Sequence, residues 1–252
     1  MSAQPLAKPQ LETSRRAPSM TRRLGQLDWK AIEQGLWERG YAKTPAVLNG
    51  DECAQLVDLY SDDSRFRSRV EMARYHFGMG EYKYFGDPLP PIVREIRAEA
   101  YRSLVSTANR WIEALGSSEN YPPDLSAFLE ICARRGQPKP APLLLRYQEG
   151  DYNCLHQDLL GDLAFPFQLT CALSRRSIDY TGGEFLLVEQ WRGAHSRGEV
   201  VTLEQGELVI FTTDCRPAAG KQGYRRVHLR HGVSRVTSGR RYSLGVIFHN
   251  SK

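Results

Sequence analysis

The spacing of apolar residues changes near residue 141, and this change constrains the fold more than any other feature of the sequence. Before it, apolar side chains recur at the three- and four-residue intervals of helices, most clearly between Pro91 and Leu115. After it, short β-rich runs alternate with turn residues, at 143–148, 168–173, 184–190, 199–203, 207–212 and 242–249. The sequence therefore predicts an α+β protein, with helices first and a β core second.

The turns between these runs narrow the choice of β architecture. Glycine-containing turns separate the runs at short, regular intervals, which is typical of sandwiches and jelly-roll barrels. We expect one domain over 26–252, in which a helical part, 26–140, buttresses a β core, 141–252. The stretch 74–85 does not fit the helical pattern and could be a hairpin or a loop. Residues 1–25 combine Pro, Ser and Arg without apolar periodicity, which predicts a mobile basic arm.

Composition places the chain among globular proteins and limits its expected location. Apolar residues make up 41% and charged residues 25% of the 252 residues. No apolar run approaches the roughly 20 residues that span a bilayer. Residues 1–23 lack the hydrophobic centre of a signal peptide, so we expect a cytoplasmic protein without membrane contact. The five cysteines form no CxxC pair, which predicts reduced thiols rather than a disulfide or zinc framework.

Charge is distributed unevenly along the chain. The net charge of +5 divides into +4 for residues 1–27, −8 for 28–215 and +9 for 216–252, where no acidic residue occurs. A basic segment attached to an acidic body suggests an anionic partner such as nucleic acid. The alternative is that these arginines only solvate strand faces, and composition alone favours it.

Three residues in the β-rich half have the types and the spacing of a metal site. His156 and Asp158 are two positions apart, which places both side chains on one face of an extended strand. His231, on a later strand, would complete a set of two imidazoles and one carboxylate, a set that holds Fe(II) and leaves positions open for small ligands. His228 is the rival for the second imidazole, but it precedes Arg241 by thirteen residues instead of ten.

A possible anion site follows the last of these histidines. Arg241 and Ser243 share one strand face, ten and twelve residues beyond His231. A guanidinium can bind a carboxylate through two hydrogen bonds, and the serine hydroxyl could add a third. The sequence therefore predicts that a carboxylate-bearing ligand binds beside the metal.

The other histidines and two tyrosines are open to simpler interpretations. His195 and His249 are expected to be ordinary surface or core residues, and His76, which lies among aromatic residues, is expected to pack against them. Tyr82 and Tyr84 could line a substrate groove, but their two-residue spacing is more typical of packing within a strand.

The order HxD, His-Gly-Val and GxRxS within a β-rich half resembles the 2-oxoglutarate- and Fe(II)-dependent dioxygenases. The likeness extends over about 143–249, and the stretches 182–185 and 206–211 also resemble strand signatures of that family. It implies a double-stranded β-helix, which is a jelly-roll barrel, with Fe(II) as cofactor, 2-oxoglutarate as cosubstrate and O2 as oxidant.

The same resemblance implies roles for individual residues. The iron ligands and catalytic residues would be His156, Asp158 and His231. The distal carboxylate of 2-oxoglutarate would bind Arg241, beside Ser243. Tyr147 matches a tyrosine that contacts the cosubstrate in prolyl-hydroxylase-like members, and Tyr152 is a weaker candidate for that contact.

More narrowly, the motifs at 155–158 and 230–234 are similar to those of bacterial proteins regarded as nucleic-acid oxygenases, which demethylate damaged bases in DNA repair. The basic segment agrees with such a partner, because its arginines surround His231 in sequence and a cleft lined by them would attract phosphates. An aromatic side chain that could stack a base would come from Tyr82, Tyr84 or Phe85.

Two other functions stay open. The ten-residue gap between His231 and Arg241 is closer to prolyl-hydroxylase-like enzymes, and the pair of C-terminal arginines typical of bacterial alkylation-repair oxygenases has no counterpart at their spacing. A protein side-chain hydroxylase is therefore the alternative to a base demethylase. A non-catalytic barrel that binds a small acid or a metal is the third possibility, which the intact triad and Arg241 disfavour.

Overall fold

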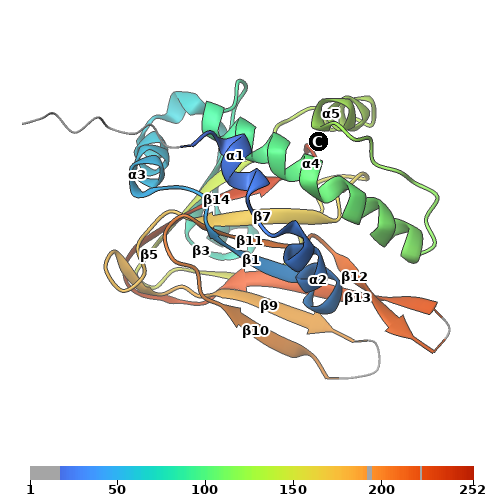
Figure 1. Cartoon of the computed structure of the whole chain (residues 1–252). Helices are drawn as coiled ribbons and strands as arrows, with labels where there is room; N and C mark the ends of the chain where they lie inside the picture. Colours follow the sequence, from blue (N-terminus) through green and yellow to red (C-terminus); the bar gives the residue numbers. More distant parts are fainter. Residues whose placement is uncertain (1–17, 192–194, 222) are drawn as a thin grey trace, which may run out of the picture.

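The computed structural model describes residues 18–191, 195–221 and 223–252. Two antiparallel sheets form the walls of a barrel, and helices cover the outer side of the larger sheet, as Figure 1 shows. This arrangement confirms an α+β protein whose double-stranded β-helix core is buttressed by N-terminal helices. No helix in the described ranges combines the length and the apolar character needed to cross a bilayer.

One helix is much longer than the others. The helices are α1 (Met20–Gly25), α2 (Trp29–Arg39), α3 (Gly50–Asp58), α4 (Pro91–Ala114) and α5 (Leu125–Arg134), with short 3-10 helices at Leu59–Ser61, Asp63–Arg65 and Met72–Tyr75. The strands are β1 (Tyr41–Ala46), β2 (Phe66–Glu71), β3 (Gly78–Met79), β4 (Glu81–Phe85), β5 (Leu143–Gln148), β6 (Tyr152–His156), β7 (Phe167–Ala172), β8 (Tyr180–Gly182), β9 (Phe185–Gln190), β10 (Arg197–Val201), β11 (Glu207–Thr212), β12 (Cys215–Gly220), β13 (Gly223–Val233) and β14 (Val236–Ile247).

Strand pairing brings distant segments of the chain together in each sheet. The larger sheet has the order β1-β11-β7-β14-β5-β4-β2, with β8 paired to β14, and the smaller one has the order β10-β9-β13-β6-β3, with β12 paired to β13. In the larger sheet Arg241 lies opposite Tyr147, and in the smaller sheet His231 lies opposite His156. The two registers therefore place the predicted site residues on the two walls of the barrel.

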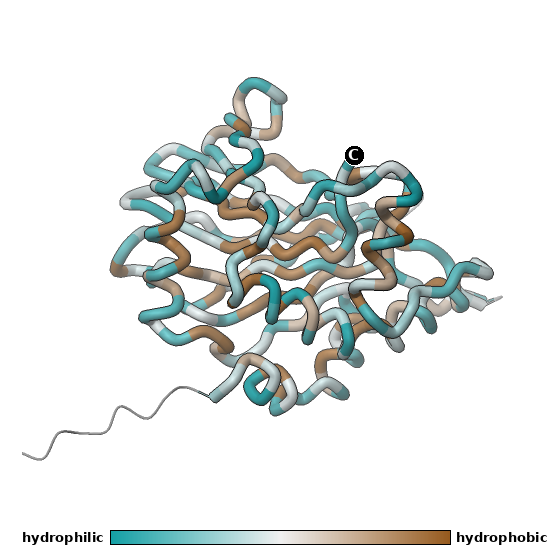
Figure 2. Tube along the Cα trace, turned by 90° about the horizontal axis from the view of Figure 1, so that it is seen from above, coloured by the Kyte–Doolittle hydropathy of each residue, from teal (hydrophilic) through white to brown (hydrophobic). Residues whose placement is uncertain are grey.

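Alternation along the strands separates the helix-covered core from the barrel interior. Cys171, Leu208 and Leu244 are buried in one core together with the helices. Thr170 and Ser243, which precede two of them in sequence, point the other way and line an internal pocket. Figure 2, seen from above the helical layer, shows hydrophobic stretches through the centre of the molecule and hydrophilic ones at its periphery. Each large apolar side chain buried in this layer contributes about 1.5–3 kcal/mol to stability.

α4 holds the helical layer to the larger sheet. Pro91 occupies its first turn, where a proline costs no backbone hydrogen bond. Its buried face carries apolar residues at helical spacing and ends with Trp111, whose ring lies 4.5 Å from that of Phe167 in β7. The helix predicted from Pro91 to Leu115 is confirmed.

The N-terminal half is less uniformly helical than the prediction for 26–140. β1 pairs with β11, β4 pairs with β5, and β2 pairs with β4, so three segments from this half extend the larger sheet. The prediction of a helical part is wrong for β1 and β2, because each is only six residues long, too short to show a clear period. β4 agrees with the hairpin that is one of the two structures expected for 74–85, since it pairs antiparallel with β2. Pro45 is tolerated in β1 because that strand lies at the edge of the sheet.

The predicted mobile arm ends before residue 25. In α1, Met20 and Leu24 are buried, and the Arg23 guanidinium lies 2.6 Å from the Glu52 carboxylate in α3. The prediction is therefore wrong for residues 20–25, because two apolar side chains and an ion pair anchor them. Residues 1–17, which make up most of the predicted arm, lie outside the described residues.

Candidate metal centre

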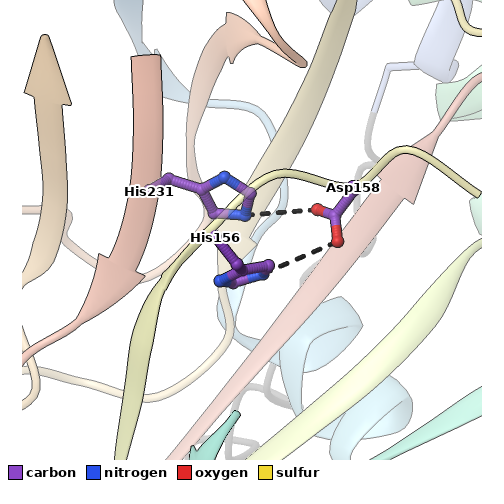
Figure 3. Close-up of side chains that lie close together, drawn as sticks. All are labelled: His156, Asp158 and His231. Carbon is purple, nitrogen blue, oxygen red and sulfur yellow. Dashed lines mark ion pairs between the residues drawn. The ribbon is translucent and has the colours of Figure 1, made fainter. Parts of the chain in front are cut away.

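Two histidines and an aspartate meet inside the barrel. His156 is the last residue of β6, Asp158 lies just beyond that strand, and His231 comes from β13, as Figure 3 shows. The Nε2 atom of His231 is 3.2 Å from Oδ2 of Asp158, and Nε2 of His156 is 3.6 Å from Oδ1. One ligand atom from each residue lies within 4.8 Å of the others, so a single ion could contact all three. This set of donors fits Fe(II).

Neighbouring groups hold both imidazoles in place. Nδ1 of His156 is 2.8 Å from the carbonyl oxygen of Cys154, which can only accept a hydrogen bond. Nδ1 therefore carries a proton, and Nε2 is the atom that could bind a metal. The ring of His231 lies 5.9 Å from that of Phe185 and 4.8 Å from that of Phe211. The aromatic contacts orient His231 within an apolar wall.

The mutual electrostatics of the three side chains favour an ionised carboxylate. Burial opposes charge on Asp158, but the two imidazoles that face it outweigh burial and hold its pKa well below the usual value. Burial also disfavours a charged His156, yet the hydrogen bond and the charge of Asp158 raise the pKa of that imidazole. Burial, followed by the nearby charge of His156, lowers the pKa of His231. Asp158 and His231 therefore have the protonation states that metal ligands require, and a metal ion would displace the proton that Asp158 favours on His156.

His228 does not belong to this group. It lies three positions before His231 on β13, and an odd spacing along a strand turns a side chain to the opposite face. There its Nδ1 is 2.8 Å from Oδ1 of Asp214, and the two residues form a second group of possible ligands with Cys215. Of the two rival histidines, only His231 lies beside His156 and Asp158.

Gln157, the middle residue of the HxD motif, fastens this segment to its neighbours. Its Nε2 lies 2.9 Å from the carbonyl oxygen of Leu229 in β13, and 2.9 and 2.8 Å from the carbonyl and side-chain oxygens of Asp214. Because Gln157 sits between His156 and Asp158, these hydrogen bonds hold the carboxylate close to β13. Nothing in the sequence marks this residue except its place inside the motif.

Arg241 is a buried cation without an acidic partner. Only 4% of its surface is exposed, and no carboxylate in residues 18–191, 195–221 or 223–252 lies within ion-pair distance. One Nη donates to the Ser243 hydroxyl at 3.2 Å, the guanidinium lies 5.4 Å from the centre of the Tyr147 ring, and Nε has no hydrogen-bond partner. Burying an unpaired charge costs free energy, so the surroundings of Arg241 fit an anionic ligand.

The triad and Arg241 share one pocket of 220 Å³ between the two sheets. Two amide side chains that sequence reasoning missed also line it, and each has an unpartnered buried atom: Oδ1 of Asn153 and Nε2 of Gln168. Burial raises the pKa of Tyr147 to about 12, so its hydroxyl stays protonated beside them. Unpaired polar atoms inside a pocket indicate a polar ligand. The signal for Gln168 was its polar side chain within the apolar run of β7.

The structure distinguishes among the aromatic residues expected near the site. Tyr82 and Tyr84 line the pocket, and their rings are perpendicular with centroids 5.4 Å apart. They therefore pack against each other within the strand and also form part of the groove wall. Phe85 is fully buried in the core under the helices and cannot stack a base. Tyr152 lies outside the pocket, under the guanidinium of Arg235.

The remaining histidines are not part of the triad, and of these His249 lies near Asp158, whose carboxylate and backbone partly oppose the effect of burial on the pKa of His249. His249 is fully buried, its Nδ1 accepts a hydrogen bond from the Phe165 amide, and burial lowers its pKa to about 4. His195 is exposed, as expected for a surface residue. His76 is also exposed, which contradicts the expectation that it packs, because its left-handed backbone (φ 59°) turns the chain outward.

Most basic residues of 216–252 do not line the pocket, which contradicts the expected basic cleft. Arg216 is buried in an ion pair with Glu189, and the exposed Arg226 and Arg230 lie on the outward face of β13. Strand alternation explains the error, because residues that flank His231 in sequence face away from it. Arg241 alone among the basic residues of this segment lines the pocket within the described part of the chain.

Comparison with known proteins agrees with this geometry. A family model named Oxygenase-NA, with the description "Oxygenase, catalysing oxidative methylation of damaged DNA", matches residues 80–251, a range that includes the triad and Arg241. The chain belongs to this oxygenase family. Two proteins of Mycobacterium tuberculosis, the uncharacterized proteins MT2286 and Rv2227, are 41% identical to it over 167 residues, which are 66% of this chain and 72% of each relative.

Solved structures share the fold of this family member. A prolyl-4-hydroxylase of Pseudomonas putida superposes with a TM-score of 0.51 at 16% identity, over 86% of this chain and 96% of that one. A prolyl 4-hydroxylase of Phytophthora capsici gives a TM-score of 0.53 at 13% identity, over 93% of this chain and 67% of that one. The resemblance drawn from the motifs is thus confirmed for the family and for the barrel.

Proposed function

We propose that this oxygenase uses Fe(II) and 2-oxoglutarate to demethylate alkylated bases of nucleic acid. The observation that carries the proposal is that a two-histidine, one-carboxylate group and a buried arginine without an acidic partner share one pocket. A metal site alone would fit many functions, and a buried arginine alone would fit any acid. Together they fit a metal enzyme whose cosubstrate carries carboxylates.

His156, Asp158 and His231 would hold Fe(II) through two Nε2 atoms and one carboxylate oxygen. When bound, such an ion supplies oxidation of a C–H bond by O2, coupled to decarboxylation of 2-oxoglutarate. Arg241 would bind the distal carboxylate of the cosubstrate through its paired N–H groups, and the Ser243 hydroxyl would lie beside it.

The pocket walls support this assignment by positioning the cosubstrate and excluding water. The Tyr147 ring lies against the Arg241 guanidinium and limits its rotation. Phe185 and Phe211 give the wall around His231 a low polarity, which strengthens charge interactions inside the pocket. These side chains would orient the cosubstrate before the substrate arrives.

The description of the family, which names damaged DNA, supports this substrate class. We infer removal of a methyl group rather than its addition, because oxidation of an N-methyl carbon gives a hydroxymethyl group that leaves as formaldehyde. The exposed arginines of β13 support a polyanionic partner, although they lie outside the pocket. DNA repair in the cytoplasm is the corresponding cellular role.

The experiment offers single-stranded DNA, single-stranded RNA and peptide libraries to the Fe(II)-loaded protein with 2-oxoglutarate. We expect formaldehyde and the loss of a methyl group from N-methylated oligonucleotides. Hydroxylated peptides without formaldehyde would instead identify a protein hydroxylase, the second candidate, which the spacing from His231 to Arg241 and the prolyl 4-hydroxylase fold support. Equal turnover of 2-oxoglutarate with and without every substrate would contradict both.

A further inference from the structure

Exposed apolar side chains gather at one end of the pocket. Eight large hydrophobic side chains are exposed within the described part of the chain, and five of them lie in the two segments 75–79 and 155–159. We call these five the rim: Tyr75, Phe77, Met79, Leu155 and Leu159. Their exposed fractions run from 39% to 59%, so each offers surface to a partner. Exposed apolar groups that cluster beside a pocket mark a binding surface.

The two rim segments lie side by side. β3 pairs with β6, and the Cys154 amide donates to the carbonyl oxygen of Phe77 at 2.7 Å. Gly78 makes this close approach possible, because its φ is +129° and a Cβ there would lie 2.4 Å from the carbonyl oxygen of Tyr152. The pairing of β3 with β6 therefore brings the two rim segments next to each other.

The rim leads directly to the metal centre. The ring of Phe77 lies 6.4 Å from that of His156, and Phe77 and Leu159 are also pocket-lining residues. Farther out, the rings of Tyr75 and Phe77 are nearly parallel, with centroids 6.2 Å apart and an angle of 22° between their planes. A flat ligand that rests on this surface would lie at the entrance to the triad.

A cation lies beside this aromatic surface. The exposed guanidinium of Arg235 lies 5.3 Å from the centre of the Tyr152 ring, and Tyr152 is the strand partner of Met79 in the rim. Arg235 donates to the carbonyl oxygen of Gly150, and within residues 18–191, 195–221 and 223–252 it has no ion pair with a carboxylate. Stacking surfaces next to a free arginine are the combination that binds single-stranded nucleic acid.

We propose that the rim is a stacking surface for an unpaired base of single-stranded nucleic acid, with Arg235 at a phosphate of the same strand. Tyr75 and Phe77 stack the base, and the apolar groups of Met79, Leu155 and Leu159 cover its edges. This inference rests on the proposed function, because it supplies the means by which an alkylated base would be presented to the triad. It adds that the substrate is single-stranded at the site, since a base within a duplex has both faces covered.

The test measures the affinity of the Fe(II)-loaded protein for a fluorescent single-stranded oligodeoxynucleotide that carries one N-methylated base. Tyr75→Ala removes one stacking ring and should weaken binding about 5- to 100-fold, whereas Tyr75→Phe keeps the ring and should bind as the wild type does. Arg235→Gln should weaken binding and lower its dependence on salt. Ile178→Ala is the control for the loss of an exposed apolar side chain, because Ile178 is 72% exposed but lies outside both rim segments and outside β13.

Several results would overturn the inference. Unchanged affinity in Tyr75→Ala, an equal loss in Ile178→Ala, or equal affinity of the wild type for the duplex form would each do so. A loss of peptide binding in Tyr75→Ala, with oligonucleotide binding intact, would reassign the rim to a protein partner. Succinate formation without substrate separates this inference from the proposed function: Tyr75→Ala should retain it, and its absence from the wild type would instead contradict the enzyme.

Discussion

Two groups of possible metal ligands share strand β13, three residues apart, one on each face of the sheet. His231 faces inward and meets His156 and Asp158, whereas His228 faces outward and meets Asp214 and Cys215. Each group contains a histidine and an aspartate within hydrogen-bonding distance. What differs is the surroundings, and these give the two groups different chemistry.

The inward group lies in a pocket with free polar atoms, and the outward group lies on an exposed basic face. Arg226 and Arg230 flank His228 on the same side of β13, where their positive charges disfavour a cation. Burial raises the pKa of Cys215 to about 12, so its thiol stays protonated and is a poor ligand. Ligand type alone therefore does not define a metal site, and strand alternation decides which environment each histidine has.

The largest expected effect comes from replacing the aspartate of the inward group and comparing it with the aspartate of the outward group. Asp158→Ala should weaken Fe(II) binding by more than about 100-fold, because it removes the anionic ligand between two imidazoles. Asp214→Ala is the matched control and should weaken Fe(II) binding far less, because Gln157 keeps its hydrogen bonds to the carbonyl oxygens of Asp214 and Leu229. Anaerobic titration calorimetry measures both, and equal losses in the two variants would contradict the assignment of the inward group.

The second prediction concerns the anion site that only the inward face offers. Arg241→Ala should remove a charge-assisted pair worth about 2–3 kcal/mol and raise the KM for 2-oxoglutarate by tens to hundreds of fold. Arg241→Lys should recover only part of this loss, because an ammonium cannot form the paired contact. Arg240→Ala, one position away on the exposed face, should leave KM unchanged. Steady-state kinetics decides, and a normal KM in Arg241→Ala would mean that another cation binds the cosubstrate.

A third prediction contrasts the buried His249 with the exposed His228. The pKa of His249 is about 4 in the folded protein and about 6.5 in an unfolded chain, so the unfolded state takes up a proton first as the pH falls. The stability that neutral His249 contributes is present above pH 6.5 and should fall by about 2 kcal/mol between pH 7 and pH 5. Urea unfolding at pH 7 and pH 5 measures the free energy of unfolding of both variants. His228→Gln should keep the loss of about 2 kcal/mol that His249 causes, and His249→Gln should lack it. The same pH dependence in both variants would disprove it.

The smallest expected effect tests the outward face as an anion-binding surface. Each phosphate contact made by a basic side chain contributes about −0.7 to the log–log dependence of single-strand affinity on salt. Arg226→Glu with Arg230→Glu should therefore flatten that slope by about 1.4 and leave substrate-free turnover of 2-oxoglutarate unchanged. A slope equal to that of the wild type would remove these arginines from the nucleic-acid interface.

The sequence was most informative where a short motif or a regular period coincided with a single element. The runs 143–148 and 207–212 match β5 and β11, and α4 matches the long helical period. The triad could be identified because HxD and His-Gly-Val lie on strands that the family likeness places side by side. Both predictions depend on patterns among residues close in sequence, and each pattern lies within or directly beside a single strand or helix of the folded chain.

Other parts could not be predicted, because the positions of their side chains depend on contacts between distant segments. The length of β13 could not be predicted, because its exposed arginines hide the apolar alternation. For the same reason the expectation that Arg226 and Arg230 line the cleft is wrong, since they face away from it. Gln157 and Asn153 gain their roles only from β13 and from the pocket. The aromatic rim is also invisible in sequence, because its two segments, 75–79 and 155–159, are brought together only through the pairing of β3 with β6.

The central claim is that the inward group on β13 is the iron centre of a 2-oxoglutarate-dependent oxygenase. Succinate formation from 2-oxoglutarate by the Fe(II)-loaded protein tests it most directly, with the wild type, His231→Ala and His228→Ala compared side by side. We predict that the wild type and His228→Ala produce succinate at similar rates, and that His231→Ala falls at least 100-fold below them. Near wild-type succinate formation by His231→Ala, or none by the wild type, would contradict the claim.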